Sequence, residues 1–87
     1  MKPTVTLDVR YFAWLRERIG VPVEQVETGA ATVAELVGEL RGREARYALA
    51  LSDLAAVRVA VDQELAGLDT PLAGVREVAF FPPMTGG

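Results

Sequence analysis

The sequence has no cysteine and no histidine among its 87 residues. Without thiols the chain forms neither disulfides nor thiolate nucleophiles, and without imidazole it lacks the commonest general base and a principal zinc ligand. The single serine, Ser52, therefore has no imidazole to activate it. An enzyme of this size would need two carboxylates held together in a cleft, and no spacing in the chain forces such a pair together away from solvent.

Long hydrophobic runs are also missing. The longest candidate, residues 47–61, is interrupted by Ser52, Asp53 and Arg58, so it falls short of the ~18 apolar residues of a membrane-spanning helix. Met1-Lys2-Pro3 leads directly into an alternating segment, which is not the pattern of a signal peptide. We therefore expect a cytoplasmic protein with no membrane partner.

Positive charge is scarce: nine basic residues are outnumbered by twelve acidic ones, and the net charge is −3. The basic residues form no stripe along the sequence, so a nucleic-acid partner is not expected. The chain has no glycine-rich loop followed by a lysine, which is the usual motif for cradling ATP phosphates. We expect one small domain that binds no metal and no cofactor of its own.

Strand and helix patterns alternate along the chain. Period-two alternation predicts five strands, at residues 4–10, 23–27, 57–61, 64–68 and 77–81. Helical spacing of apolar residues predicts helices at residues 13–19, 32–40 and 43–51. Thr32 and Glu35 match a capping box at the start of the main helix, and Gly20 stands where a C-cap glycine belongs. Asp62-Gln63 is expected to form a hairpin turn.

This order of elements predicts an α+β fold of the β-grasp (ubiquitin-like) type. A mixed sheet of about five strands is expected to pack against one main helix plus short helices, with the last strand returning beside the first. Residues 1–81 are expected to form the β-grasp domain, and residues 82–87 a flexible, extended C-terminal tail.

The tail ends in Gly86-Gly87, and its carboxylate is the one reactive group that needs no neighbouring side chain. Two glycines without Cβ atoms make a thread thin enough for a narrow tunnel. Pro82 and Pro83 stiffen its base and end the last strand. Six extended residues reach roughly 20 Å, which is far enough to enter another protein. The alternative is that the two glycines are simply a frayed chain end.

The segment from Glu77 to Gly87, EVAFFPPMTGG, resembles the terminus of the small subunits of molybdopterin synthase. Weaker resemblance runs through residues 11–17, the capped helix from Thr32, residues 57–63 and residues 69–72. The loop before the last strand departs from the family, because Val75 and Arg76 stand where acidic or turn residues are usual. Arg76 is expected to change the charge near the exit of the tail.

The resemblance implies a mechanism. An E1-like adenylating enzyme would activate the Gly87 carboxylate with Mg-ATP, and a sulfur donor (a sulfurtransferase) would convert the adenylate to a thiocarboxylate. The tail would then enter the large subunit of molybdopterin synthase and give its sulfur to a pterin precursor. In this picture the chain is a non-catalytic carrier in a heterotetramer. Gly87 is the covalent site, Gly86 makes it accessible, and the acid–base residues belong to the large subunit.

Nine residues are candidates for contact with partners: Phe12, Leu65, Arg76, Phe80, Phe81, Pro82, Pro83, Met84 and Thr85. Phe80 and Phe81 are adjacent on a strand, so one must face the core while the other is either a docking anchor or ordinarily packed. For Phe12 core packing is the expected role, with docking as the alternative. Leu65 and its neighbour Leu68 belong either to the core or to an apolar patch beside the tail. Arg76 is expected to be solvated unless it pairs with a partner carboxylate.

Other functions remain open on the sequence. If its tail serves another pathway, the chain would be a sulfur carrier for thiamine or transfer-RNA thiolation, or a ubiquitin-like modifier. It is a passive β-grasp interaction module if its tail is incidental, and an independent enzyme only if a carboxylate pair exists. Deletion of Gly86 and Gly87 separates these classes, since only a carrier or modifier depends on them.

Overall fold

The computed structural model describes residues 4–83. Its elements are β1 (Val5–Tyr11), α1 (Ala13–Ile19), β2 (Val23–Thr28), α2 (Val33–Arg41), α3 (Ala45–Ala50), the 3-10 helix η1 (Leu54–Ala56), β3 (Arg58–Val61), β4 (Glu64–Ala66) and β5 (Glu77–Phe81). All strands and helices expected from the sequence are present. Only η1 was not expected; it begins at Asp53, whose side chain accepts a hydrogen bond from the Ala55 N–H at 3.1 Å.

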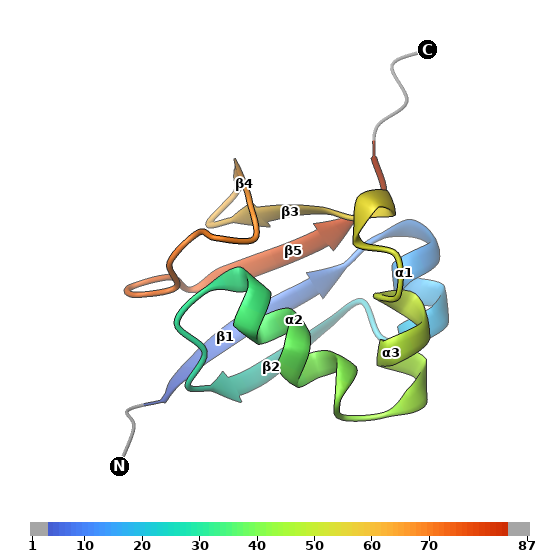
Figure 1. Ribbon diagram of the computed structural model, residues 1–87, viewed down its shortest axis with the longest axis horizontal. Coiled ribbons are helices and arrows are strands. Elements are labelled where there is room, and N and C mark those ends of the chain that lie inside the picture. The colour runs from blue at the N-terminus through green and yellow to red at the C-terminus, as the bar shows by residue number, and fades with distance from the viewer. Residues whose placement is uncertain (1–3, 84–87) are drawn as a thin grey trace.

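The five strands form one mixed sheet in the order β2-β1-β5-β3-β4. β1 and β5 are parallel, whereas the other neighbouring pairs are antiparallel. In Figure 1, α2 crosses one face of the sheet, while α1, α3 and η1 lie around the end where β1 and β5 finish. This arrangement confirms the predicted α+β fold of the β-grasp, ubiquitin-like type.

The two faces of the sheet differ because side chains alternate along each strand. Leu7, Val9 and Tyr11 of β1 and Val78 and Phe80 of β5 point into the core beneath the helices, and all five are almost fully buried. The opposite face, called the open face below, carries the alternate residues of each strand. It is formed by Thr6, Asp8, Arg10, Val23, Gln25, Glu27, Arg58, Ala60, Leu65, Glu77, Ala79 and Phe81.

The main helix is capped much as its sequence predicts. The Glu35 N–H donates to Thr32 Oγ1 at 3.3 Å, which satisfies one of the free donors of the first turn. The Glu35 carboxylate accepts from the Ala31 N–H at 3.4 Å, one residue before the position that an ideal capping box uses. At the end of α1, Gly20 has the left-handed φ of 99° that was expected of a C-cap glycine.

The hairpin between β3 and β4 turns at Asp62 and Gln63, as predicted. Both residues have positive φ, 49° and 71°, which is the pairing that two-residue hairpin turns require. Asp62 Oδ1 accepts hydrogen bonds from the N–H groups of Arg76 and Glu77, each at 3.0 Å. The turn therefore fixes the beginning of β5, at the end of the strand that lies away from the tail.

None of the helices in residues 4–83 has both the length and the apolar character needed to cross a bilayer.

Candidate functional site

The site that the sequence pointed to begins where the sheet ends. β5 finishes at Phe81, β1 finishes beside it, and β3 starts beside it with Arg58 paired to Phe81. These strand directions bring Phe12, Arg58, Phe81, Pro82 and Pro83 to one end of the sheet, a set of residues called the tail base below. Figure 1 shows the ends of β1 and β5 and the start of β3 at this end. The segment that follows, Met84 to Gly87, lies outside the described residues, so the roles assigned to Met84, Thr85, Gly86 and Gly87 remain predictions.

The adjacent phenylalanines take opposite roles. Phe80 is only 1% exposed and stacks on Tyr11, with ring centroids 6.1 Å apart and planes at 14°. The prediction that Phe80 contacts a partner is therefore corrected: its ring is buried in the core and offers a partner almost no surface. Phe81 points to the open face and is partly exposed. Of the two, it is the one with aromatic surface available to a partner.

Phe12 and Leu65 are exposed, contrary to the core packing considered for them. Phe12 is 46% exposed because it follows Tyr11 in the alternation of β1 and so points away from the core. Leu65 is 78% exposed because its strand, β4, is at the edge of the sheet and turns this side chain to the open face. With the partly exposed Phe81 they make three apolar side chains that keep solvent-accessible surface, and they are called the docking face below after the role proposed for them; Leu65 lies two strands away from β5. Leu68, at 42%, is also exposed.

The expected effect of Arg76 on the tail exit is wrong. Arg76 is exposed and precedes the first residue of β5, whereas the tail leaves after Phe81. The five residues of an extended strand separate the two positions by roughly 15 Å. The charged residue at the tail base is instead Arg58, which pairs with Phe81 in the sheet. The ion pair between Arg10 Nε and Glu77 Oε1, 3.0 Å apart, lies on the open face toward the beginning of β5.

A polar cluster beneath the tail base was not found from the sequence. Glu24 Oε2, on β2, accepts hydrogen bonds from the hydroxyls of Tyr11 and Tyr47, each at 2.8 Å. Its other oxygen lies 3.5 Å from Arg43 Nη1. Tyr11, Glu24, Arg43 and Tyr47 are called the tyrosine–glutamate cluster below. Burial, and then the hydrogen bond and charge of Glu24, raise the pKa of both tyrosines, so both hydroxyls keep their protons to a higher pH than an exposed tyrosine does.

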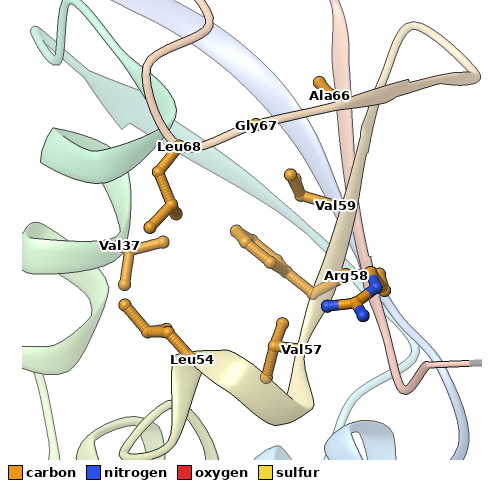
Figure 2. Close-up of a pocket in the computed structure, with 9 residues that line it drawn as sticks. Val37, Leu54, Val57, Arg58, Val59, Ala66, Gly67 and Leu68 are labelled. Carbon is orange, nitrogen blue, oxygen red and sulfur yellow. The ribbon is translucent and has the colours of Figure 1, made fainter.

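An apolar cavity of about 220 Å³ lies between α2, η1 and the β3–β4 hairpin. Figure 2 shows the side chains of Val37, Leu54, Val57 and Leu68 converging on it, while the guanidinium of Arg58 lies to one side. No carboxylate or hydroxyl side chain is among the residues that line it. This cavity therefore offers no general base and no nucleophile, and its walls belong to the packing of the domain.

The comparisons with known proteins agree with this geometry. The family described as ThiS matches residues 9–87. The Escherichia coli (strain K12) protein named molybdopterin synthase sulfur carrier subunit is 41% identical over 81 residues, which cover 93% of this chain and 99% of that protein.

Solved structures extend the likeness to three dimensions. SAMP1 from Haloferax volcanii has a TM-score of 0.72 and 28% identity, and the match covers 95% of this chain and all of that one. A chain from the complex of subunits 1 and 2 of the molybdopterin-converting factor of Helicobacter pylori 26695 has a TM-score of 0.59 and 27% identity, with 95% of this chain and 100% of that one covered. The resemblance to small subunits of molybdopterin synthase is confirmed, and the chain belongs to the ThiS family.

Proposed function

We propose that this chain is the sulfur carrier subunit of a molybdopterin synthase, with its own C-terminal Gly87 as the sulfur-bearing group. The observation that carries the proposal is the 41% identity, over 93% of the chain, to a protein of that name. The sequence adds a terminal Gly-Gly after a strand and two prolines, and the strand directions set the base of that tail at one end of the sheet.

The chemistry is divided between this chain and its partners. The Gly87 carboxylate attacks the α-phosphorus of Mg-ATP held by an E1-like adenylating enzyme, and pyrophosphate leaves. Sulfur at the sulfide level, supplied by the sulfur donor, then attacks the carbonyl carbon of the acyl-adenylate; the C–S bond forms, AMP leaves, and Gly87 ends in a thiocarboxylate. ATP binds to the partner, because the sequence of this chain has no phosphate-cradling loop. The activation energy of each step is lowered by partner residues, while this chain supplies the reagent.

Delivery requires the large subunit of the synthase, in which the thiocarboxylate gives its sulfur to the pterin precursor. A complex of this kind is known for the H. pylori relative. The docking face suits such a contact, because its aromatic and leucine side chains keep apolar surface that a partner would bury. Phe12, Leu65 and Phe81 would anchor the carrier, and Pro82 and Pro83 would direct the tail into the active site.

The decisive experiment is intact-mass measurement of the chain after incubation with the adenylating enzyme, Mg-ATP and a sulfur source. One oxygen of the chain should be exchanged for one sulfur, and fragmentation should place the exchange at Gly87. A chain that ends at Thr85 is the control and should gain no sulfur. If the full chain keeps its original mass while an authentic carrier in the same mixture is charged, the proposal is wrong.

A second function, that of a ubiquitin-like modifier, is favoured by the likeness to the small archaeal modifier protein SAMP1 at a TM-score of 0.72. A modifier joins its activated terminus to lysine amines of other proteins, whereas a carrier gives up sulfur and is released. The same incubation with cell protein added separates the two. Isopeptide-linked adducts that carry the Gly-Gly remnant identify a modifier. Co-purification with the large subunit, and not with enzymes of thiamine or transfer-RNA thiolation, identifies the molybdopterin pathway.

A further inference from the structure

The tyrosine–glutamate cluster is joined to the tail base by direct contacts. The Tyr11 ring, whose hydroxyl is bound to Glu24, stacks on Phe80, the residue before the partly exposed Phe81. Phe12, which follows Tyr11 in the sequence, donates its backbone N–H to the Phe80 carbonyl at 3.1 Å. One tyrosine therefore holds both the ring and, through its neighbour, the backbone of the last core residue before the tail.

The same cluster is fixed from the helical side. The guanidinium carbons of Arg43 and Arg46 lie 5.1 and 5.0 Å from the centroid of the Tyr47 ring. Arg46 also donates to the Ile19 carbonyl at the end of α1 and pairs with Glu44 at 2.9 Å. Glu24 thus accepts hydrogen bonds from a tyrosine hydroxyl of β1 and from one of α3. β1 is also bound to β5, and α3 is also bound to the end of α1 through Arg46. Through Glu24, α3 is therefore connected to the ring that supports Phe80.

Stability alone does not explain a carboxylate at this place. Two phenylalanines over an apolar residue would fill the same volume without the cost of drawing a carboxylate away from water. Directional hydrogen bonds instead restrict the ring of Tyr11 to one orientation, where apolar packing alone permits several. Phe80 stacks on this Tyr11 ring, so the cluster helps to fix the position of the end of β5.

We propose that Tyr11, Glu24 and Tyr47 are positioning residues that hold the docking face and the tail base in the geometry needed to engage the large subunit. This inference rests on the proposed function, because the engagement that it serves is that of a sulfur carrier. We assign none of the three a contact with substrate; they act through Phe80 and Phe12.

The chain provides a matched control for the test. Thr28, at the other end of β2, donates its hydroxyl to Glu39 Oε1 at 2.5 Å and is 2% exposed. Tyr11→Phe, Tyr47→Phe and Thr28→Val each delete a hydroxyl bound to a glutamate, but only the two tyrosine variants do so beneath the tail base. Thr28→Val also removes the acceptor of the Ala30 N–H, 3.0 Å away, so it is the more disruptive change locally. Glu24→Gln keeps one acceptor oxygen and should behave between wild type and Tyr11→Phe.

Two readouts on the full chain separate positioning from simple stability. The dissociation constant for the large subunit should rise about three- to tenfold in Tyr11→Phe and Tyr47→Phe, as expected for partial loss of one charge-assisted hydrogen bond, and by less than about twofold in Thr28→Val. Hydrogen exchange of the Phe12 amide, which is bound to Phe80, should accelerate in the tyrosine variants and stay unchanged in Thr28→Val.

The outcomes are distinguishable. If the tyrosine and threonine variants bind the large subunit alike, or if exchange at Phe12 does not respond to Tyr11→Phe, the positioning role is wrong. If wild type itself does not bind the large subunit, the proposed function fails instead. The exchange of Phe12 then still decides whether the cluster controls the end of the sheet.

Discussion

The two faces of the sheet use similar side chains for different purposes. On the covered face, Phe80, Tyr11 and Val78 are almost fully buried and hold the helices to the sheet. On the open face, Phe81 and Leu65 keep exposed apolar surface although a polar residue at either position would cost the isolated chain little. Because the stability of the domain does not require apolar side chains at these two positions, we infer that they serve contact with a partner.

This difference assigns fold and function to opposite sides of one layer. The covered face holds the core of the domain, and in the proposed function the open face and the tail engage the partner. The predictions below test this division, and they begin with the group that belongs to neither face.

Truncation of the chain after Thr85 should have the largest effect, a complete loss of sulfur transfer. The described core is drawn from residues 7–80, so the free energy of unfolding should change by less than about 0.5 kcal/mol. Thiocarboxylate formation measured by mass and stability measured in urea would test both statements. A truncated chain that still supports sulfur transfer would remove the basis of the proposed mechanism.

Exchange of each phenylalanine for alanine should separate the faces at adjacent positions. Phe80→Ala removes a buried ring from the core and should lower the free energy of unfolding by about 3–5 kcal/mol. Phe81→Ala removes a partly exposed ring and should cost about 1 kcal/mol or less. Denaturant titration of the two variants decides the matter. Equal losses would mean that the open face contributes to the stability of the isolated chain as much as the core does.

Leu65→Ala should weaken binding without weakening the fold. Loss of an anchoring side chain costs about 2 kcal/mol, so the dissociation constant for the large subunit should rise by more than about tenfold. Leu49→Ala is the matched control, because Leu49 is also an exposed leucine, at 67%, but lies on α3 away from the open face. Calorimetric titration of both variants should show a loss for Leu65 alone. A similar loss for Leu49 would move the contact to the helical side.

Much of the fold follows from local pattern. The cap at Thr32 and the left-handed Gly20 depend on neighbours within a few residues, and both formed as the sequence predicts. The alternation at Phe80 and Phe81 also follows, because adjacent strand residues must face opposite ways. It does not say which face is covered. That depends on the pairing of Phe80 with Tyr11 and Val59, residues far away in the chain.

The parts that were missed depend on distant contacts. Glu24 lies 13 and 23 residues from the two tyrosines that bind it, so no spacing in the sequence signals the cluster. The prediction for Arg76 failed for the opposite reason. Arg76 is near the tail in the sequence, but the extended strand β5 separates it from the tail base at the other end of the sheet. Exposure of Phe12 and Leu65 likewise depends on which strands lie beside them.

The free energy of unfolding should depend on alkaline pH through the buried Tyr11. Burial and Glu24 raise the pKa of Tyr11 above its ordinary value of 10.0, so above that pH the unfolded chain loses a proton that the folded chain retains. The unfolded state then binds fewer protons, and stability must fall as the pH rises further. Tyr11→Phe should flatten this fall, and denaturant titrations between pH 8 and pH 11, both approximate limits, would measure it. The same slope in the variant would show that Tyr11 is not the responsible group.

The smallest expected effect concerns the cavity in Figure 2. Ala66 lines this space of about 220 Å³ from β4, on the covered side of the sheet. Ala66→Val adds two methyl groups in a residue suited to strands, and it should raise the free energy of unfolding by about 0.5–1 kcal/mol. Thermal unfolding would measure the gain. The dissociation constant for the large subunit should not change, because the added methyl groups point away from the open face. A variant that becomes more stable and yet binds more weakly would show that the cavity side also meets the partner, and the division between the two faces would then fail at β4.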